Sequence, residues 1–180
     1  MDNLFAKIQQ DLTDALKQKK DEIVGRWFEA VLNTYHEDAR GPMRRTEAQF
    51  TNPVGYNFRE GLDGLFDAVL QGMLPDTITG FLNAIVRIRA VQDFSPSQSL
   101  SFIFQLKTIL REAAGPELSA DAKAAEEYVR LDGVIDDLAL FAFDLYMECR
   151  EKIYAIKAQE ARDMTFRLLQ KAQSIAGHEE

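Results

Sequence analysis

The chain has 180 residues, of which 46% are hydrophobic and 28% charged; this composition is typical of one folded domain with a small appendage and excludes an intrinsically disordered chain. The formal net charge of −8 repels polyanions, which argues against nucleic acid and anionic membranes as partners. Every apolar run is interrupted well before the roughly 20 residues of a membrane span. The start Met1-Asp2 shows no secretory signal. The single cysteine, Cys149, cannot form an internal disulfide. We therefore expect a cytoplasmic protein without membrane insertion.

Hydrophobic periodicity predicts an all-α fold. Apolar residues recur at steps of three and four almost throughout the chain, whereas the strict alternation of a half-buried strand is missing. Apolar residues at helical spacing in residues 4–16 and again in residues 23–35 predict two helices or one bent helix. Residues 36–51, with Gly41-Pro42 and little periodicity, predict the one substantial loop. Further helices are expected over residues 53–70, 76–91 and 96–110 and from about residue 131 onward, which gives a bundle of six or seven helices.

Two helix starts carry distinct capping signals. Ser95 stands three residues before Gln98, so each side chain can bond the other's backbone amide in a capping box. Asn52 precedes Pro53, a pair that suits the cap and the first position of a helix. Gly55 permits the close approach of another group there, and Tyr56 offers a hydroxyl. We interpret Asn52 and Tyr56 as parts of a capped helix entrance; the alternative is a ligand-binding position.

Arg87 and Arg89 lie in the helix that precedes Ser95. Residues two apart on a helix point about 200° apart, so the apolar stripe of this helix leaves at least one arginine flanking or facing the core. Our first hypothesis is a structural ion pair with Asp93, or with Glu60, Asp63 or Asp67 on the preceding helix. The alternative is that an arginine and the amides of the Ser95 helix start bind an anion or the carboxylate of a partner.

The last helical region shows a coiled-coil-like spacing. Its apolar residues fall at alternating intervals of three and four, and we expect them to form the seam of a homodimer: Leu131, Val134, Leu138, Phe141, Leu145 and Cys149. A helix from residue 138 to 173 would be about 50 Å long, so its end is expected to project. Residues 156–180 are predicted to be a frayed tail or one strand of a dimeric helix pair.

Residues that would support catalysis or metal binding are scarce. His36 and His178 are the two histidines, and neither has a glutamate three residues before it or lies in a periodic apolar helix, which argues against a di-iron or haem site. Cys149 lies on an apolar stripe, where a buried thiol is expected. Nucleophile elbows, phosphate-binding glycine loops and dinucleotide fingerprints are absent. We expect no enzyme activity, no catalytic residues, no metal and no cofactor.

Several stretches of the sequence together resemble a known family. They are residues 23–27 (IVGRW), 50–56 (FTNPVGY), 87–98 (RIRAVQDFSPSQ) and 102–107 (FIFQLK), and they are similar to the RsbRD N-terminal domain family over roughly residues 4–155. Members look like the sensory halves of RsbT co-antagonists, which belong to the bacterial stressosome. The resemblance implies a dimeric, globin-like helical fold without haem. Such co-antagonists continue into a phosphorylatable STAS domain, whereas this chain ends with a helix where that domain would begin.

These observations predict a non-enzymatic bacterial regulatory or sensor module that acts by protein-protein interaction. We expect a helical sensor domain in residues 1–155, a helical extension in residues 156–180, a homodimer, and a regulatory protein partner that the sequence does not identify. The alternative is a receptor for a small molecule or anion, with an apolar pocket near Arg87, Arg89 and the helix start at Ser95.

Overall fold

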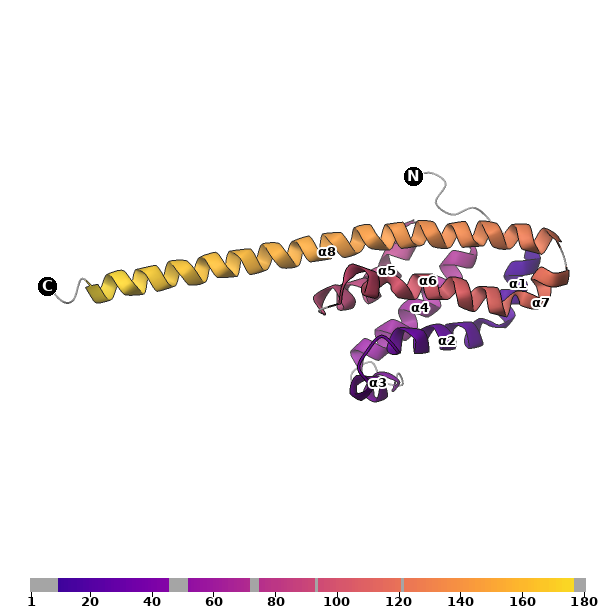
Figure 1. Cartoon of the computed structure of the whole chain (residues 1–180), viewed down its shortest axis with the longest axis horizontal. Coiled ribbons are helices and arrows are strands. Elements are labelled where there is room, and N and C mark those ends of the chain that lie inside the picture. Colours follow the sequence, from indigo (N-terminus) through magenta and orange to yellow (C-terminus); the bar gives the residue numbers. More distant parts are fainter. Residues whose placement is uncertain (1–9, 46–51, 72–74, 93, 121, 177–180) are drawn as a thin grey trace.

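The computed structural model describes residues 10–45, 52–71, 75–92, 94–120 and 122–176. These residues form helices and connecting turns without a strand (Figure 1). The helices are α1 (Gln10–Gln18), α2 (Lys20–Leu32), α3 (Glu37–Met43), α4 (Pro53–Gln71), α5 (Pro75–Val91), α6 (Pro96–Ala113), α7 (Gly115–Ala120) and α8 (Ala122–Ala176). The expected all-α bundle with a long C-terminal helix is confirmed. The apolar stripes predicted in residues 4–16 and 23–35 fall in two separate helices, α1 and α2, which meet at Lys19.

The predicted loop over residues 36–51 is wrong in its first half, where the chain forms the short helix α3. Glu37 and Asp38 stand in its first turn, where negatively charged side chains stabilise a helix by interacting with the positive end of its dipole. Arg40 fixes α3 to the turn that follows α2, because its Nε donates to the carbonyl of Tyr35 at 2.8 Å. Pro42 lies in the last turn of α3, one residue before its end at Met43, and its missing backbone donor agrees with the helix stopping there. Residues 46–51 lie outside the described part.

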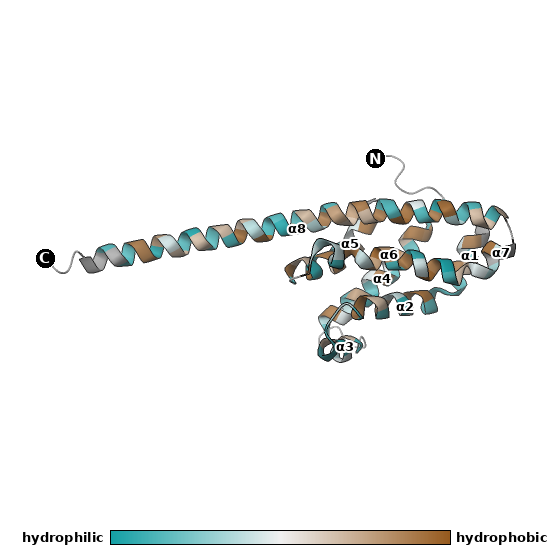
Figure 2. Ribbon diagram, in the orientation of Figure 1, coloured by the Kyte–Doolittle hydropathy of each residue, from teal (hydrophilic) through white to brown (hydrophobic). Residues whose placement is uncertain are grey.

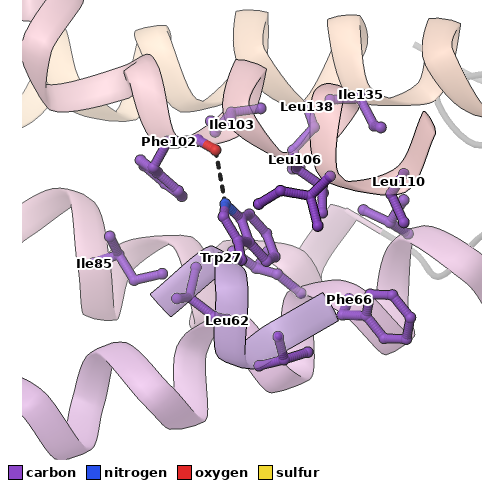
Figure 3. Packing of buried hydrophobic residues seen from close by; sticks show 14 of the residues in the cluster. Trp27, Leu62, Phe66, Ile85, Phe102, Ile103, Leu106, Leu110, Ile135 and Leu138 are labelled. Atoms are coloured by element: carbon purple, nitrogen blue, oxygen red, sulfur yellow. Dashed lines mark hydrogen bonds between the residues drawn. The ribbon is translucent and has the colours of Figure 1, made fainter. Parts of the chain in front are cut away.

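The core is centred on Trp27 of α2 (Figure 3). The ring is fully buried, stacks on Phe102 of α6 with centroids 6.0 Å apart, and donates from Nε1 to the Phe102 carbonyl at 2.7 Å. Leu62 of α4 and Leu106 of α6 close the space around it. Trp27 is therefore a core aromatic that joins α2 to α6.

The helix α8 is both a wall of the bundle and a projection from it. Its 55 residues span about 80 Å at 1.5 Å per residue. The first half packs on α6 and α5. Side chains of α8 donate hydrogen bonds to backbone carbonyls of the bundle: Tyr128 Oη to Lys107 at 2.8 Å, Tyr146 Oη to Phe94 at 3.3 Å, and Arg150 Nη1 to Ala90 at 3.0 Å. From Tyr154 to Lys171 every side chain is exposed, and this part extends away from the bundle (Figure 1).

Candidate functional site

Arg89 is fully buried at the junction of α5, α6 and the end of α2. Its Nε donates to the carbonyl of Ser99 at 2.9 Å, and its Nη2 donates to the carbonyl of Gln98 at 2.8 Å and to Thr34 Oγ1 at 3.1 Å. The guanidinium also lies over the rings of Tyr35 and Phe94, 5.4 and 4.8 Å from their centroids. Burial lowers the pKa of the Arg89 guanidinium, and the neighbouring Tyr35 acts in the opposite direction. Arg89 therefore joins three segments of the chain through neutral oxygens and aromatic faces.

The ion pairs expected for Arg89 on α4 do not form. Asp63 and Asp67 both pair with Lys20 of α2 at 2.7 Å, which joins α2 to α4, and Glu60 is exposed. Asp93 lies outside the described residues, so the structure does not address a pairing with it. Arg87 is exposed, as expected for a residue about 200° from the buried Arg89. The two arginines do not share one pocket.

The two predicted caps are present. Ser95 Oγ accepts from the Gln98 amide at 3.3 Å while Gln98 Oε1 accepts from the Ser95 amide at 3.0 Å, which confirms the capping box of α6. Asn52 Oδ1 accepts from the Gly55 amide at 3.0 Å, which confirms the cap of α4. Asn52 Nδ2 also donates to the carbonyls of Pro42 and Met43 at 2.9 Å, so one side chain joins α3 to α4. Tyr56 is half-buried beside it. These contacts describe a helix entrance.

We expect Gly55→Ala to destabilise the protein by about 2 kcal/mol, as an overpacked site does. A Cβ at Gly55 would overlap the carbonyl oxygen of Met43 and the amide of Asn52, and a backbone carbonyl cannot rotate away as a flexible side chain does. The measurement is the urea unfolding midpoint by circular dichroism. Gly80→Ala is the matched control: its Cβ would meet no atom within 4 Å, so alanine should stabilise α5 by about 0.5–1 kcal/mol. Equal behaviour of the two variants would contradict the proposed close contact.

The six residues predicted to form a dimer seam pack within the chain itself. Leu131, Val134, Leu138 and Leu145 are buried, and Phe141 and Cys149 are partly buried against the same core. Their alternating spacing marks the face of α8 that packs on the bundle. Because they are already covered by α5 and α6, a second copy of the chain would have to contact another face of α8.

A groove of about 760 Å³ lies between α6 and α8 on the outside of the bundle. Six of its lining residues have apolar side chains: Pro96, Leu100, Phe104, Ala139, Leu140 and Phe143. Phe104 and Leu140 are 52% and 68% exposed. Lys107 joins α6 to α8 beside the groove through Asp132 at 2.9 Å and Asp136 at 2.8 Å. Large apolar side chains of α6 and α8 are therefore exposed to solvent in this groove, and an ion pair beside it fixes the two helices relative to each other.

The groove continues into an exposed apolar line along α8. Leu140, Met147, Tyr154, Ala161 and Leu168 follow one another at intervals of seven residues, and all five are exposed; we call them the α8 stripe. Figure 2 shows hydrophobic residues on α8 both against the bundle and along its projecting part. A repeat of seven keeps the same face of a helix toward a partner helix that winds around it. The α8 stripe is therefore suited to packing against another helix.

Sequence reasoning missed the α8 stripe although its signal was present. Leu140 stands two residues after the core residue Leu138, and this offset turns it to the solvent side. The buried apolar residues of α8 form the stronger periodic pattern in the sequence. The exposed residues of the α8 stripe stand close to them in sequence, so periodicity does not distinguish the two sets. Phe104 could not be assigned from sequence, because only the packing of α6 against α8 shows that its ring faces outward.

Among the described residues, no group of three or more His, Cys, Asp or Glu side chains is placed to hold a metal ion. The helices within the described ranges include none that is long and apolar enough to cross a membrane.

The decisive comparison is with protein-family models. The model of the RsbT co-antagonist protein RsbRD N-terminal domain matches residues 21–161. The chain belongs to the RsbRD N-terminal domain family. The match runs from the start of α2 into the projecting part of α8, so the RsbRD N-terminal domain includes the groove and most of the α8 stripe. Comparisons with curated proteins and with solved structures gave no match, and the globin-like arrangement stays a prediction.

Proposed function

We propose that this RsbRD N-terminal domain is a non-enzymatic regulatory module of a bacterial stress-signalling pathway, and that it acts as a homodimer joined along the α8 stripe. Family membership supports the regulatory role. The observation that carries the homodimer is the continuous line of exposed apolar residues from the α6–α8 groove to Leu168. Large apolar side chains gathered on one exposed face are a mark of an interaction surface.

The heptad interval favours a helical partner, and a second α8 supplies one with the same interval. Two identical stripes can pack side by side over the whole projecting part, where each helix alone leaves its side chains in water. Each fully buried Leu or Met side chain contributes roughly 1.5–3 kcal/mol, so a few such contacts from each copy can sustain a dimer. The regulatory protein partner is then expected to bind this dimer. We assign residues 1–155 to the sensor domain and residues 156–180 to an extension that serves self-association.

The double variant Leu140→Glu/Met147→Glu is expected to convert a dimer into a monomer, because it places two carboxylates in the apolar contact at a cost of several kcal/mol. Light scattering after size exclusion should give twice the 20.4 kDa of one chain for the unmodified protein and a single chain for the variant. Both side chains are exposed within the single chain, so the variant should keep its helicity, and its unfolding midpoint should fall only by the stability that dimerisation adds.

The matched control is Phe166→Glu. Phe166 is also exposed on α8, but it stands two residues before Leu168 and points about 200° away from it. This variant should remain dimeric. A monomeric unmodified protein at tens of micromolar, or a dimer that survives the double variant, would refute self-association through the α8 stripe.

A further inference from the structure

The end of the projecting part of α8 carries apolar side chains outside the α8 stripe. Phe166 and Leu169 are 61% and 58% exposed. Because successive residues of a helix turn by about 100°, Leu169 points about 100° and Phe166 about 200° away from Leu168 of the stripe. A dimer joined along the α8 stripe therefore leaves both side chains in water. Two large apolar side chains three residues apart are neighbours on the helix surface, and together they mark a second interaction surface.

Arg162 completes a line on this side of α8. It stands four residues before Phe166 and seven before Leu169, and these intervals place the three side chains on one side of the helix. We call them the outer line. Arg162 makes no hydrogen bond or ion pair with any other residue that the structure describes, and Asp163 accepts a hydrogen bond from Gln159 at 2.8 Å instead of pairing with it. Anchors at i, i+4 and i+7 are typical of a helix that lays one face in a groove of another protein.

We propose that the outer line is the docking site for the regulatory protein partner, and that this partner receives it in an apolar groove with carboxylates on the rim. This inference rests on the proposed function and adds the docking segment and the chemistry of the partner. The chain has a formal net charge of −8, yet residues 152–171 contain five basic residues and two acidic ones. A basic, partly apolar helix end that projects from the bundle (Figure 1) attracts an acidic surface. The family match ends at residue 161, so the outer line lies outside it.

Two other occupants of the outer line fit the structure less well. A second copy of the chain would offer its α6–α8 groove, but Leu140 on the edge of that groove belongs to the α8 stripe and is covered in the proposed dimer. A lipid surface is flat, whereas the two Phe166 side chains of a dimer point away from each other, because each lies on the side of α8 opposite Leu168. A protein partner can bind on each side, which predicts two partner molecules per dimer.

Photo-cross-linking in living cells of the native host tests the outer line, with the full-length chain carrying benzoylphenylalanine in place of Phe166. We expect cross-links to one protein other than this chain. The cross-linked peptide should contain apolar residues with Asp or Glu within about one helical turn of them. Benzoylphenylalanine in place of Met164 is the positional control: residue 164 points about 200° away from residue 166 and towards the α8 stripe, so it should cross-link the second copy instead.

Charge reversal tests the chemistry of the partner. In the chain with benzoylphenylalanine at position 166, Arg162→Glu should lower the cross-link yield at least about tenfold, because it places a carboxylate against the acidic rim. The matched control is Arg167→Glu, the same charge change about 140° around the helix, which should keep the yield within about twofold. All three side chains are exposed in the projecting part, so each variant should keep its helicity and its oligomeric state.

Several results would overturn the docking site: cross-links from position 166 to lipid or solely to a second copy, a cross-linked peptide without carboxylates, equal yields from the two charge reversals, or no cross-link at all. Light scattering of the purified partner with this chain should give one partner per chain, and a single partner per dimer would also overturn it. A monomeric chain that still cross-links the partner from position 166 would support the outer line and refute self-association alone.

Discussion

Trp27→Ala is expected to destabilise the protein by about 3–5 kcal/mol, the range found when a large buried aromatic is removed. Trp27 fills the space between α2, α4 and α6, and its indole N–H donates to the Phe102 carbonyl. Alanine would leave a cavity at the centre of the bundle and remove that hydrogen bond. Since single domains are stable by about 5–15 kcal/mol, the loss is a large part of the total. Trp27 is the single tryptophan, so unfolding must be followed by circular dichroism at 222 nm instead of fluorescence.

Two further variants separate packing from hydrogen bonding at this position. Trp27→Phe keeps an aromatic ring against Phe102 and should cost about half as much as alanine. Phe166→Ala removes an aromatic side chain that is 61% exposed and should change stability by less than about 0.5 kcal/mol. If Trp27→Ala shifted the unfolding midpoint no more than Phe166→Ala, the assignment of Trp27 as the centre of the core would be wrong.

Local signals in the sequence identified the helices and their caps because those features depend on neighbouring residues. The box formed by Ser95 and Gln98 and the cap formed by Asn52 follow from side chains and amides three positions apart. The helix α3 could not be predicted from spacing, because Arg40 fixes it to the turn after α2 through a contact that spacing alone does not show. A seven-residue helix has little intrinsic stability, so its formation is decided by such contacts.

The six residues predicted to form a dimer seam lie on the side of α8 that packs on the bundle, whereas the exposed α8 stripe lies on another side of the same helix. Periodicity shows that α8 has an apolar face and does not show what covers that face. Leu138 and Leu145 are covered by the bundle, whereas Leu140 and Met147 are exposed, and the two sets differ by only two positions in the sequence. Which set meets solvent is decided by how α5 and α6 pack, and that depends on contacts between residues far apart in the chain.

Arg89→Ala is expected to cost about 3–4 kcal/mol, because it removes a fully buried side chain with three hydrogen bonds and two aromatic contacts. Arg89→Met should cost much less, about 1–2 kcal/mol. Methionine keeps most of the volume and removes a buried charge, a change that is often close to neutral. The carbonyls of Gln98 and Ser99 lie within α6, so the regular bonds of that helix can still satisfy them.

The neighbouring arginine supplies the control, since Arg87 is exposed on the same helix and Arg87→Ala should stay within about 0.5 kcal/mol of the unmodified protein. The order expected from urea midpoints is therefore Arg87→Ala, then Arg89→Met, then Arg89→Ala as the least stable. A methionine variant as unstable as the alanine variant would mean that the charge itself is needed at this position. Arg89 would then have to face an anion, and its assignment as a packing and hydrogen-bonding residue would fail. If methionine is tolerated, the junction of α5 and α6 depends on the shape of this side chain and on its contacts with Tyr35 and Phe94.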